Sequence, residues 1–235
     1  MRSSFLLCAT LIAVGVLGPG IARADGLLYQ LPEDRSWVRF DVRYTLKREG
    51  MEQANQAKLT MASVGKAFEG ADECRWIELR VQLNENGTER TLIRKLLIPE
   101  KYLKKGESPM EHVVRGWSKQ GDQDVQRAEP DDGPWPAFLA GPLQDEKKLD
   151  KQLVESKLGA LECAGVSGSV QFKAGDRDTK VVFETRLHEK APFGVVSTRM
   201  QFEMKHDGQV QESVDATLKL ADFGKDAESA LPGYQ

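Results

Sequence analysis

The chain has 235 residues, of which 33 are Lys or Arg and 36 are Asp or Glu, so its formal net charge at neutral pH is −3. This balance lacks the basic excess of domains that bind nucleic acid, which argues against DNA or RNA as a partner. No segment has the roughly twenty uninterrupted apolar residues that a membrane-spanning helix needs.

The N-terminal residues have the features of a signal peptide. Arg2 supplies a charged start, an apolar stretch runs from Phe5 to Leu17, and Ala22-Arg23-Ala24 is a small-x-small cleavage site. Removal of residues 1–24 takes Arg2 and Arg23 with it and leaves 211 residues with a net charge of −5. We therefore expect an exported protein, periplasmic or secreted, that is soluble after processing.

Strict alternation of apolar and polar residues predicts strands in the first part of the mature chain. Every second residue of Trp37–Lys47 is apolar, and Ile77–Leu83 repeats the pattern. A period of two is typical of a strand with one buried and one solvated face. Asn86-Gly87 is a common dipeptide of short hairpin turns, so Thr91–Ile98 is predicted to be the returning strand.

The C-terminal part of the chain repeats this behaviour. Apolar residues alternate with polar ones in four further runs, at Val170–Phe172, Val181–Leu187, Val196–Met204 and Val210–Leu220. His206–Gln209 predicts the turn between the last two. At least seven strands joined mostly by short turns predict a mainly antiparallel sheet with one apolar face.

The segment between these two groups of strands has a helical pattern. Pro109–Gln120 begins with proline and has apolar residues at helical spacing. Asp145–Leu158 begins with acids, continues with lysines and has an apolar stripe before Gly159, a residue typical of helix C-caps. Asp122–Pro136 between them is an acidic loop. We therefore expect an α+β fold in which residues 25–235 form one domain, an open half-barrel of curved antiparallel sheet with two short helices inserted mid-chain.

Two cysteines, Cys74 and Cys163, remain in the mature chain. Since export leads to an oxidising compartment, they are candidates for a disulfide that closes a loop of about ninety residues and contributes roughly 4–5 kcal/mol. The alternative is that each is a separately buried thiol.

Two charged residues fall on the apolar side of predicted strands. Arg94 shares the parity of Leu92 and Leu96, and Glu212 shares that of Val214. A buried lone charge is costly unless it is paired or reaches water. One interpretation is that Arg94 and Glu212 lie near each other and line a cavity where the polar head of a ligand or a covering helix binds. The other is that a β-bulge shifts the register and places them in solvent.

Three apolar residues complete the candidate ligand-binding set. Phe193 lies between Pro192 and Gly194, which interrupt a strand, and is either a plug of the core or the lip of a cavity. Met200 and Phe202 lie on the apolar side of the strand that follows.

Motifs for catalysis or metal binding do not emerge from the sequence. The three histidines, His112, His188 and His206, lack the spacing of metal ligands, so we expect no metal site and no cofactor. Gly165–Ser169 resembles a nucleophile elbow but has serine where the motif requires its last glycine.

This layout resembles the LolA-like superfamily of periplasmic lipoprotein carriers, in which a curled antiparallel sheet forms an open half-barrel and helices inserted mid-chain act as a lid. The resemblance is carried by the alternating strands that begin at Trp37 and Trp76, by the segment Pro109–Leu158, and by the strand entry Ala191–Val196. In the carriers an arginine on the concave face helps to hold the lid shut, and Arg94 has the parity for that position. The acidic loop Asp122–Asp132 departs from the pattern.

A second similarity is to uncharacterised exported proteins that share three phrases with this chain, CRWIEL (residues 74–79), LLIPEKYL (96–103) and PFGVV (192–196).

The resemblance implies a non-enzymatic exported binding protein whose concave sheet face shelters an apolar ligand or a lipid-bearing partner, with peripheral contact to a membrane. The alternative function is that of a structural or protein-interaction domain whose own two helices plug the concave face. An enzyme ranks third, because no nucleophile, carboxylate pair or metal cluster emerges. The oligomeric state is left open.

Overall fold

The computed structural model describes residues 26–85, 88–104, 106–128, 138–139, 141–174 and 177–233. The expected signal peptide and the Asn86-Gly87 turn lie outside this described part of the chain.

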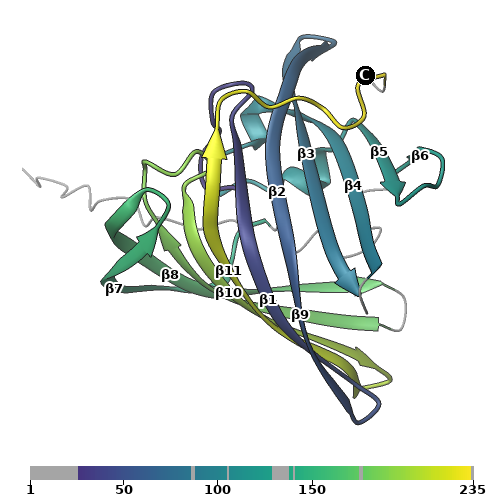
Figure 1. Cartoon of the computed structure of the whole chain (residues 1–235), viewed down its shortest axis with the longest axis vertical. Coiled ribbons are helices and arrows are strands. Elements are labelled where there is room, and N and C mark those ends of the chain that lie inside the picture. Colours follow the sequence, from purple (N-terminus) through teal and green to yellow (C-terminus); the bar gives the residue numbers. More distant parts are fainter. Residues whose placement is uncertain are drawn as a thin grey trace, which may run out of the picture.

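Within these residues, eleven antiparallel strands form one sheet (Figure 1). Six strands run from the centre of the sheet to one edge, and five return from the other edge, which gives the order β6-β5-β4-β3-β2-β1-β11-β10-β9-β8-β7. The bounds are β1 Trp37–Arg48, β2 Met51–Glu69, β3 Asp72–Glu85, β4 Thr88–Pro99, β5 Arg115–Gln120, β6 Gln126–Arg127, β7 Gln144–Ser156, β8 Gly159–Ala174, β9 Arg177–Leu187, β10 Val195–His206 and β11 Gln209–Gly224.

Strand β1 shows how the alternating pattern builds the sheet. Val38 and Phe40 are fully buried on the concave face, whereas Asp41 is exposed on the outer face. Phe40 lies in register between Leu59 of β2 and Leu220 of β11, so one row of apolar side chains crosses three strands. The predicted antiparallel arrangement is confirmed.

The expected turn at His206–Gln209 is also confirmed, because it joins β10 to β11. Asp207 and Gly208 have φ angles of 50° and 77°. Two consecutive positive φ angles are those of a type I′ hairpin turn.

One cluster of buried apolar side chains fills the concave side of the sheet. It includes Leu96 from β4 and Val166 from β8, although six strands separate these two in the sheet order. The sheet therefore curls around its own core, as Figure 1 shows, and the expected curvature is confirmed.

The connections between strands cover the upper part of this core. Leu27 of the N-terminal segment, Leu103 after β4 and Phe193 between β9 and β10 are all fully buried. Leu139, which lies in sequence between β6 and β7, is also fully buried. The backbone N–H of Leu27 donates to the carbonyl oxygen of Phe138, the residue before Leu139, at 2.8 Å.

The helix predicted over Pro109–Gln120 is wrong. Pro109–His112 forms one 3-10 turn, η2, and Arg115–Gln120 is strand β5. The apolar residues that suggested a helix divide between two faces, since Val113 packs on the concave core and Val114 packs on the outer face. A chain that crosses between faces has no single apolar stripe, so the strand pairing with β4 replaces the helix.

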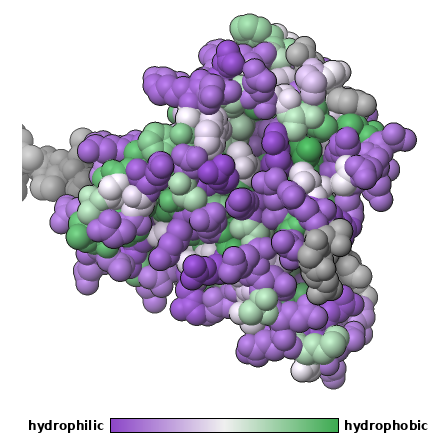
Figure 2. Space-filling view, viewed as in Figure 1, coloured by the Kyte–Doolittle hydropathy of each residue, from purple (hydrophilic) through white to green (hydrophobic). Residues whose placement is uncertain are grey.

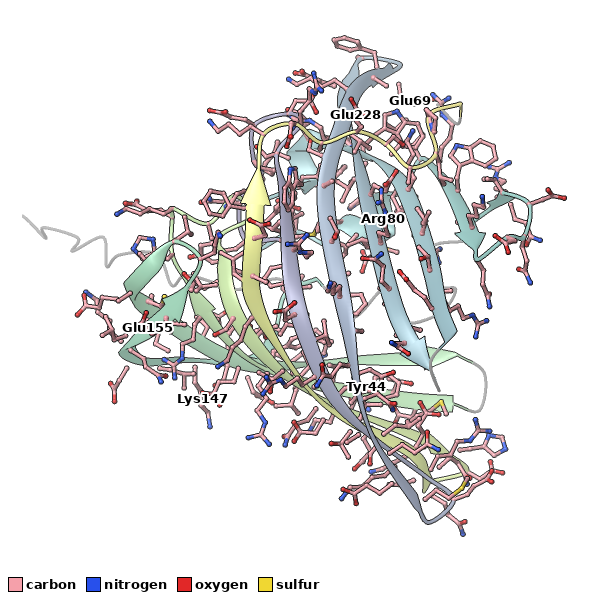
Figure 3. All side chains as sticks on the ribbon, viewed as in Figure 1. Tyr44, Glu69, Arg80, Lys147, Glu155 and Glu228 are labelled. Atoms are coloured by element: carbon pink, nitrogen blue, oxygen red, sulfur yellow. The ribbon has the colours of Figure 1, made fainter. Side chains whose placement is uncertain are left out.

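The helix predicted over Asp145–Leu158 is wrong for a different reason. Gln144–Ser156 is strand β7 at the edge of the sheet, and Gly159 is the first residue of β8. The Gln, Glu, Lys and Leu residues of β7 favour helices intrinsically, but hydrogen bonding of β7 to β8 overrides that preference. Figure 3 shows the exposed Lys147 and Glu155 pointing away from the sheet, as charged residues on edge strands commonly do.

The α+β class is therefore incorrect, and the described chain is an open all-β sheet with two 3-10 turns, η1 (Glu100–Tyr102) and η2. Among the described residues, no helix has the length and apolar character required to cross a bilayer.

The disulfide prediction is also wrong, since Cys74 and Cys163 are free and buried. Cys74 on β3 belongs to a small cluster with Trp76 and Leu97, whereas Cys163 on β8 belongs to the concave core. Five strands separate β3 from β8 in the sheet order. The alternative of two separately buried thiols is the one that the structure supports.

Candidate functional site

The lower part of the concave face, toward the β1–β2 and β10–β11 hairpins, is covered less completely than the upper part. Its side chains remain partly accessible to solvent in a continuous apolar area made of Val42, Tyr44, Leu46, Phe202, Met204 and Val214, which we call the lower concave surface. Phe202 lies in register with Val214, and Val214 with Leu46. Tyr44 is labelled on this half of the sheet in Figure 3. Partly exposed apolar side chains that adjoin one another are typical of binding surfaces.

The predicted apolar site residues separate into two groups. Phe193 is fully buried, so of its two predicted roles it is a plug of the core. Met200 is 8% exposed and Phe202 is half-buried, and the two follow each other on the concave side of β10 toward the open end. The structure therefore places Phe202 on the lower concave surface and Phe193 in the covered part.

Arg94 faces the concave side, as its parity predicts. It is 1% exposed and lies in register with Leu79 of β3 and Ser118 of β5, and the β3–β4 pairing has no register shift. The bulge that would have placed Arg94 in solvent is absent from this ladder.

Glu212 lies elsewhere, at the β10–β11 hairpin. It is half-buried and in register with Met204 and Arg48, next to a register shift after Met204. Three strands separate β4 from β11, so Arg94 and Glu212 are not neighbours in the sheet.

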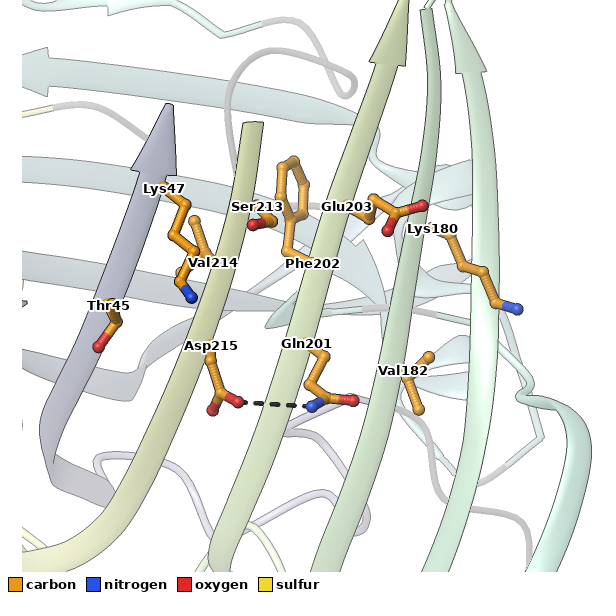
Figure 4. Close-up of a pocket in the computed structure, with 10 residues that line it drawn as sticks. All are labelled: Thr45, Lys47, Lys180, Val182, Gln201, Phe202, Glu203, Ser213, Val214 and Asp215. Carbon is orange, nitrogen blue, oxygen red and sulfur yellow. Dashed lines mark hydrogen bonds between the residues drawn. The ribbon is translucent and has the colours of Figure 1, made fainter. Parts of the chain in front are cut away.

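The outer face carries a shallow groove of about 460 Å³ over β1, β11, β10 and β9 (Figure 4). Asp215 at its centre accepts hydrogen bonds from the Arg199 guanidinium at 2.5 Å and the Gln201 amide at 3.4 Å. The bond from Arg199 lowers the pKa of Asp215 despite partial burial. Lysines and acids alternate around this groove, so it has no dominant charge for one class of ligand.

A polar network fixes the N-terminal segment to the top of the sheet. The buried Arg75 guanidinium donates to Glu100 at 2.6 Å, to the Ser63 hydroxyl at 2.9 Å and to the carbonyl of Pro32 at 3.1 Å. Ser63 donates in turn to Asp34 at 2.8 Å. Burial opposes ionisation of Asp34, but hydrogen bonds from Ser63 and from backbone N–H groups outweigh it, so the pKa of Asp34 is lowered.

Sequence reasoning missed two buried charges on the outer face, Glu78 and Lys95. Their parity is that of solvated positions, yet they are only 3% and 2% exposed. Desolvation lowers the pKa of Lys95, and attraction to Glu78 opposes this only in part. No pattern within β3 or β4 predicts this burial, because residues 229–231, far along the chain, cover Glu78 and Lys95.

The histidines have separate local roles. The ring of His112 stacks on Tyr102 with centroids 3.5 Å apart, and His188 accepts the backbone N–H of Lys190. In the described part of the chain, no group of three His, Cys, Asp or Glu side chains could hold a metal ion.

Comparison with known proteins gives no family model and no curated protein that matches the chain. Three solved structures are similar at low level: a DUF1329 family protein from Desulfovibrio piger, a candidate lipoprotein from Parabacteroides distasonis and a candidate outer membrane lipoprotein-sorting domain from Vibrio parahaemolyticus.

Their identities to this chain are 8%, 8% and 9%, and their TM-scores are 0.34, 0.31 and 0.33. The matches cover 86%, 83% and 82% of this chain and 90%, 100% and 86% of the other chains. At these scores the likeness carries no argument about activity, so function has to be inferred from this chain's own geometry.

Proposed function

We propose that this is an exported, non-enzymatic binding protein that holds an apolar ligand, such as an acyl chain, on the lower concave surface. The observation that supports the proposal is the unequal cover of one apolar face. Connections of the chain bury the upper half, whereas Val42, Tyr44, Leu46, Phe202, Met204 and Val214 keep part of their surface accessible. An antiparallel sheet normally buries the whole of its apolar face.

The alternative of a fully plugged core with no ligand is supported by the cover of the upper half, in which Phe193 is fully buried. Phe193 plugs the upper core, but it lies before β10 begins at Val195, and the accessible residues of β10 lie farther along that strand. A ligand of acyl type would bury these side chains at a gain of about 25 cal/mol per Å² of apolar surface.

The test is to purify the chain from a bacterial host, extract it with organic solvent, and record a native mass spectrum beside a titration with the fluorescent fatty acid cis-parinaric acid. We expect about one apolar molecule bound per chain and saturable uptake of the probe by the extracted protein. A spectrum of the bare chain together with no probe uptake would contradict the proposal.

A further inference from the structure

The C-terminal segment crosses the outer face of the sheet after β11. In Figure 1 it runs in front of β1 to β4, on the side opposite the η1 and η2 turns. The Trp37 indole N–H donates to Asp226 at 2.7 Å, and the N–H of Ala227 donates to the carbonyl of Arg35 at 2.8 Å. These bonds guide the segment onto β3 and β4.

The segment then contacts two charged side chains on the outer face, Glu78 and Lys95. The Glu78 carboxylate of β3 accepts the Ser229 hydroxyl at 2.8 Å and the backbone N–H of Ala230 at 3.0 and 3.1 Å. The Lys95 ammonium of β4, in register with Glu78, donates to the carbonyl of Leu231 at 3.0 Å. The Lys95 ammonium also lies 5.0 Å above the Trp76 ring.

The contacts recognise the backbone of the segment as well as its side chains. Glu78 binds a main-chain donor, Lys95 binds a main-chain acceptor, and the Leu231 side chain is 2% exposed. Apolar residues at both positions would cover the sheet at least as favourably, since taking charged side chains out of water is costly. An extended peptide presents main-chain N–H and C=O groups to its binding site, and Glu78 and Lys95 supply an acceptor and a donor for them.

The surrounding surface differs from this site. Figure 2 shows a mostly hydrophilic outer face with small apolar patches. Under the segment, Trp76 and Leu97 form a buried apolar cluster with Cys74. Glu228, labelled in Figure 3, is exposed at the start of the bound stretch, so the buried part begins after it.

We propose that Trp76, Glu78 and Lys95 form a peptide-recognition site for an extended segment with the pattern small, small, aliphatic, and that the chain's own Ser229–Leu231 is a tethered occupant of this site. The partner is then a protein that offers such a segment and displaces the tether. The site lies on the opposite face from the lower concave surface. Evidence against ligand binding on that surface would therefore not contradict peptide binding here, and the reverse also holds.

The test uses the full chain with Leu231→Ser, which weakens the tethered occupant, and Pro232→Ala as a control at an exposed position of the same segment. The probe is the synthetic peptide ESALPGYQ, the sequence of residues 228–235. We expect calorimetry to show one peptide bound per Leu231→Ser chain. Binding to the unsubstituted and Pro232→Ala chains should be at least tenfold weaker, because a tethered segment competes at millimolar effective concentration.

Adding Lys95→Met to Leu231→Ser should weaken peptide binding at least tenfold, and ESASPGYQ should not bind. A folded Leu231→Ser chain that takes up no peptide at 1 mM, or that binds a scrambled peptide equally well, overturns the proposal. If Leu231→Ser does not fold, the proposal is tested by measuring hydrogen exchange of backbone N–H groups in the unsubstituted chain. The Ala230 N–H must then exchange at least a hundredfold faster than the N–H groups of β3, and equal rates mean that the segment never leaves.

Discussion

The backbone N–H of Tyr29 donates to the carbonyl oxygen of Phe193 across 3.0 Å and so joins the N-terminal segment to the β9–β10 connection. The side-chain amide of Gln30 reinforces this link by donating to the carbonyl of Ala191 at 2.8 Å. The Pro192-Phe193-Gly194 kink is therefore a structural joint, and the burial of Phe193 is fixed from outside its own strand.

Gly194→Ala should lower the free energy of unfolding by about 2–4 kcal/mol. Gly194 has a φ of +84°, and an added Cβ would lie 2.8 Å from the Cβ of Tyr29, so strain of the left-handed backbone and overpacking act together. The measurement is urea unfolding. Gly208→Ala is the matched control, because its φ is +77° with nothing within 4 Å, and it should cost only about 1 kcal/mol. Equal losses would contradict the contact with Tyr29.

Asp34→Asn should destabilise the protein in a manner that depends on pH. The folded state lowers the pKa of Asp34, so its contribution is complete above the unfolded pKa and is lost as the pH falls through the folded pKa. We expect a loss of about 1–2 kcal/mol at pH 7, from weakened hydrogen bonds to a charged group, that shrinks below the ordinary aspartate value of 3.8. Urea unfolding between pH 7 and pH 3 measures it. The exposed Asp122→Asn should show no such difference.

Lys95→Met should reveal a second pH dependence, in the alkaline range. The pKa of Lys95 is lowered from 10.5 in the folded state, so the folded chain loses its proton before the unfolded chain does. The wild type should therefore gain stability relative to Lys95→Met as the pH rises toward 10.5, in urea unfolding at pH 8 and above. The exposed Lys219→Met is the control. A relative loss on raising the pH would mean that attraction to Glu78 dominates over desolvation.

The thiols of Cys74 and Cys163 should be unreactive in the native protein. Burial raises the pKa of both, which keeps them protonated, and each side chain is inaccessible. Iodoacetamide should label neither residue in buffer and both in guanidinium chloride, with the sites mapped by peptide mass spectrometry. A reductant should leave the melting temperature unchanged, whereas a fall of several degrees would show a disulfide.

Phe202→Glu should reduce uptake of cis-parinaric acid at least tenfold, because it places a carboxylate on the lower concave surface. Gln201→Glu is the matched control, since Gln201 is the preceding residue of β10 and is exposed on the outer face. Circular dichroism should show that both variants are folded. Equal binding by the two variants would place the ligand elsewhere.

Strands whose sequence alternates strictly could be predicted from the sequence, and those shaped by distant partners could not. β1 and β11 carry their apolar face in their own residues, whereas β7 is a strand because β8 lies beside it. The inward direction of Arg94 followed from parity alone. The burial of Lys95 did not, because its cover lies 136 residues away in the chain. Alternation within a strand predicts which face of the sheet a side chain lies on. It does not predict which distant segment of the chain covers that face.

The pairing of β1 with β11 has a kinetic consequence. Trp37 lies opposite Gly224, whereas the other strand pairs join neighbours along the chain. The sheet thus consists of two meanders of local pairings that meet at one seam of very long sequence separation. Loop closure over such a distance is slow, so each meander can form first and the seam joins them last. Refolding should then be limited by a single late step, and substitutions in the seam should slow that step more than equally destabilising substitutions within either meander.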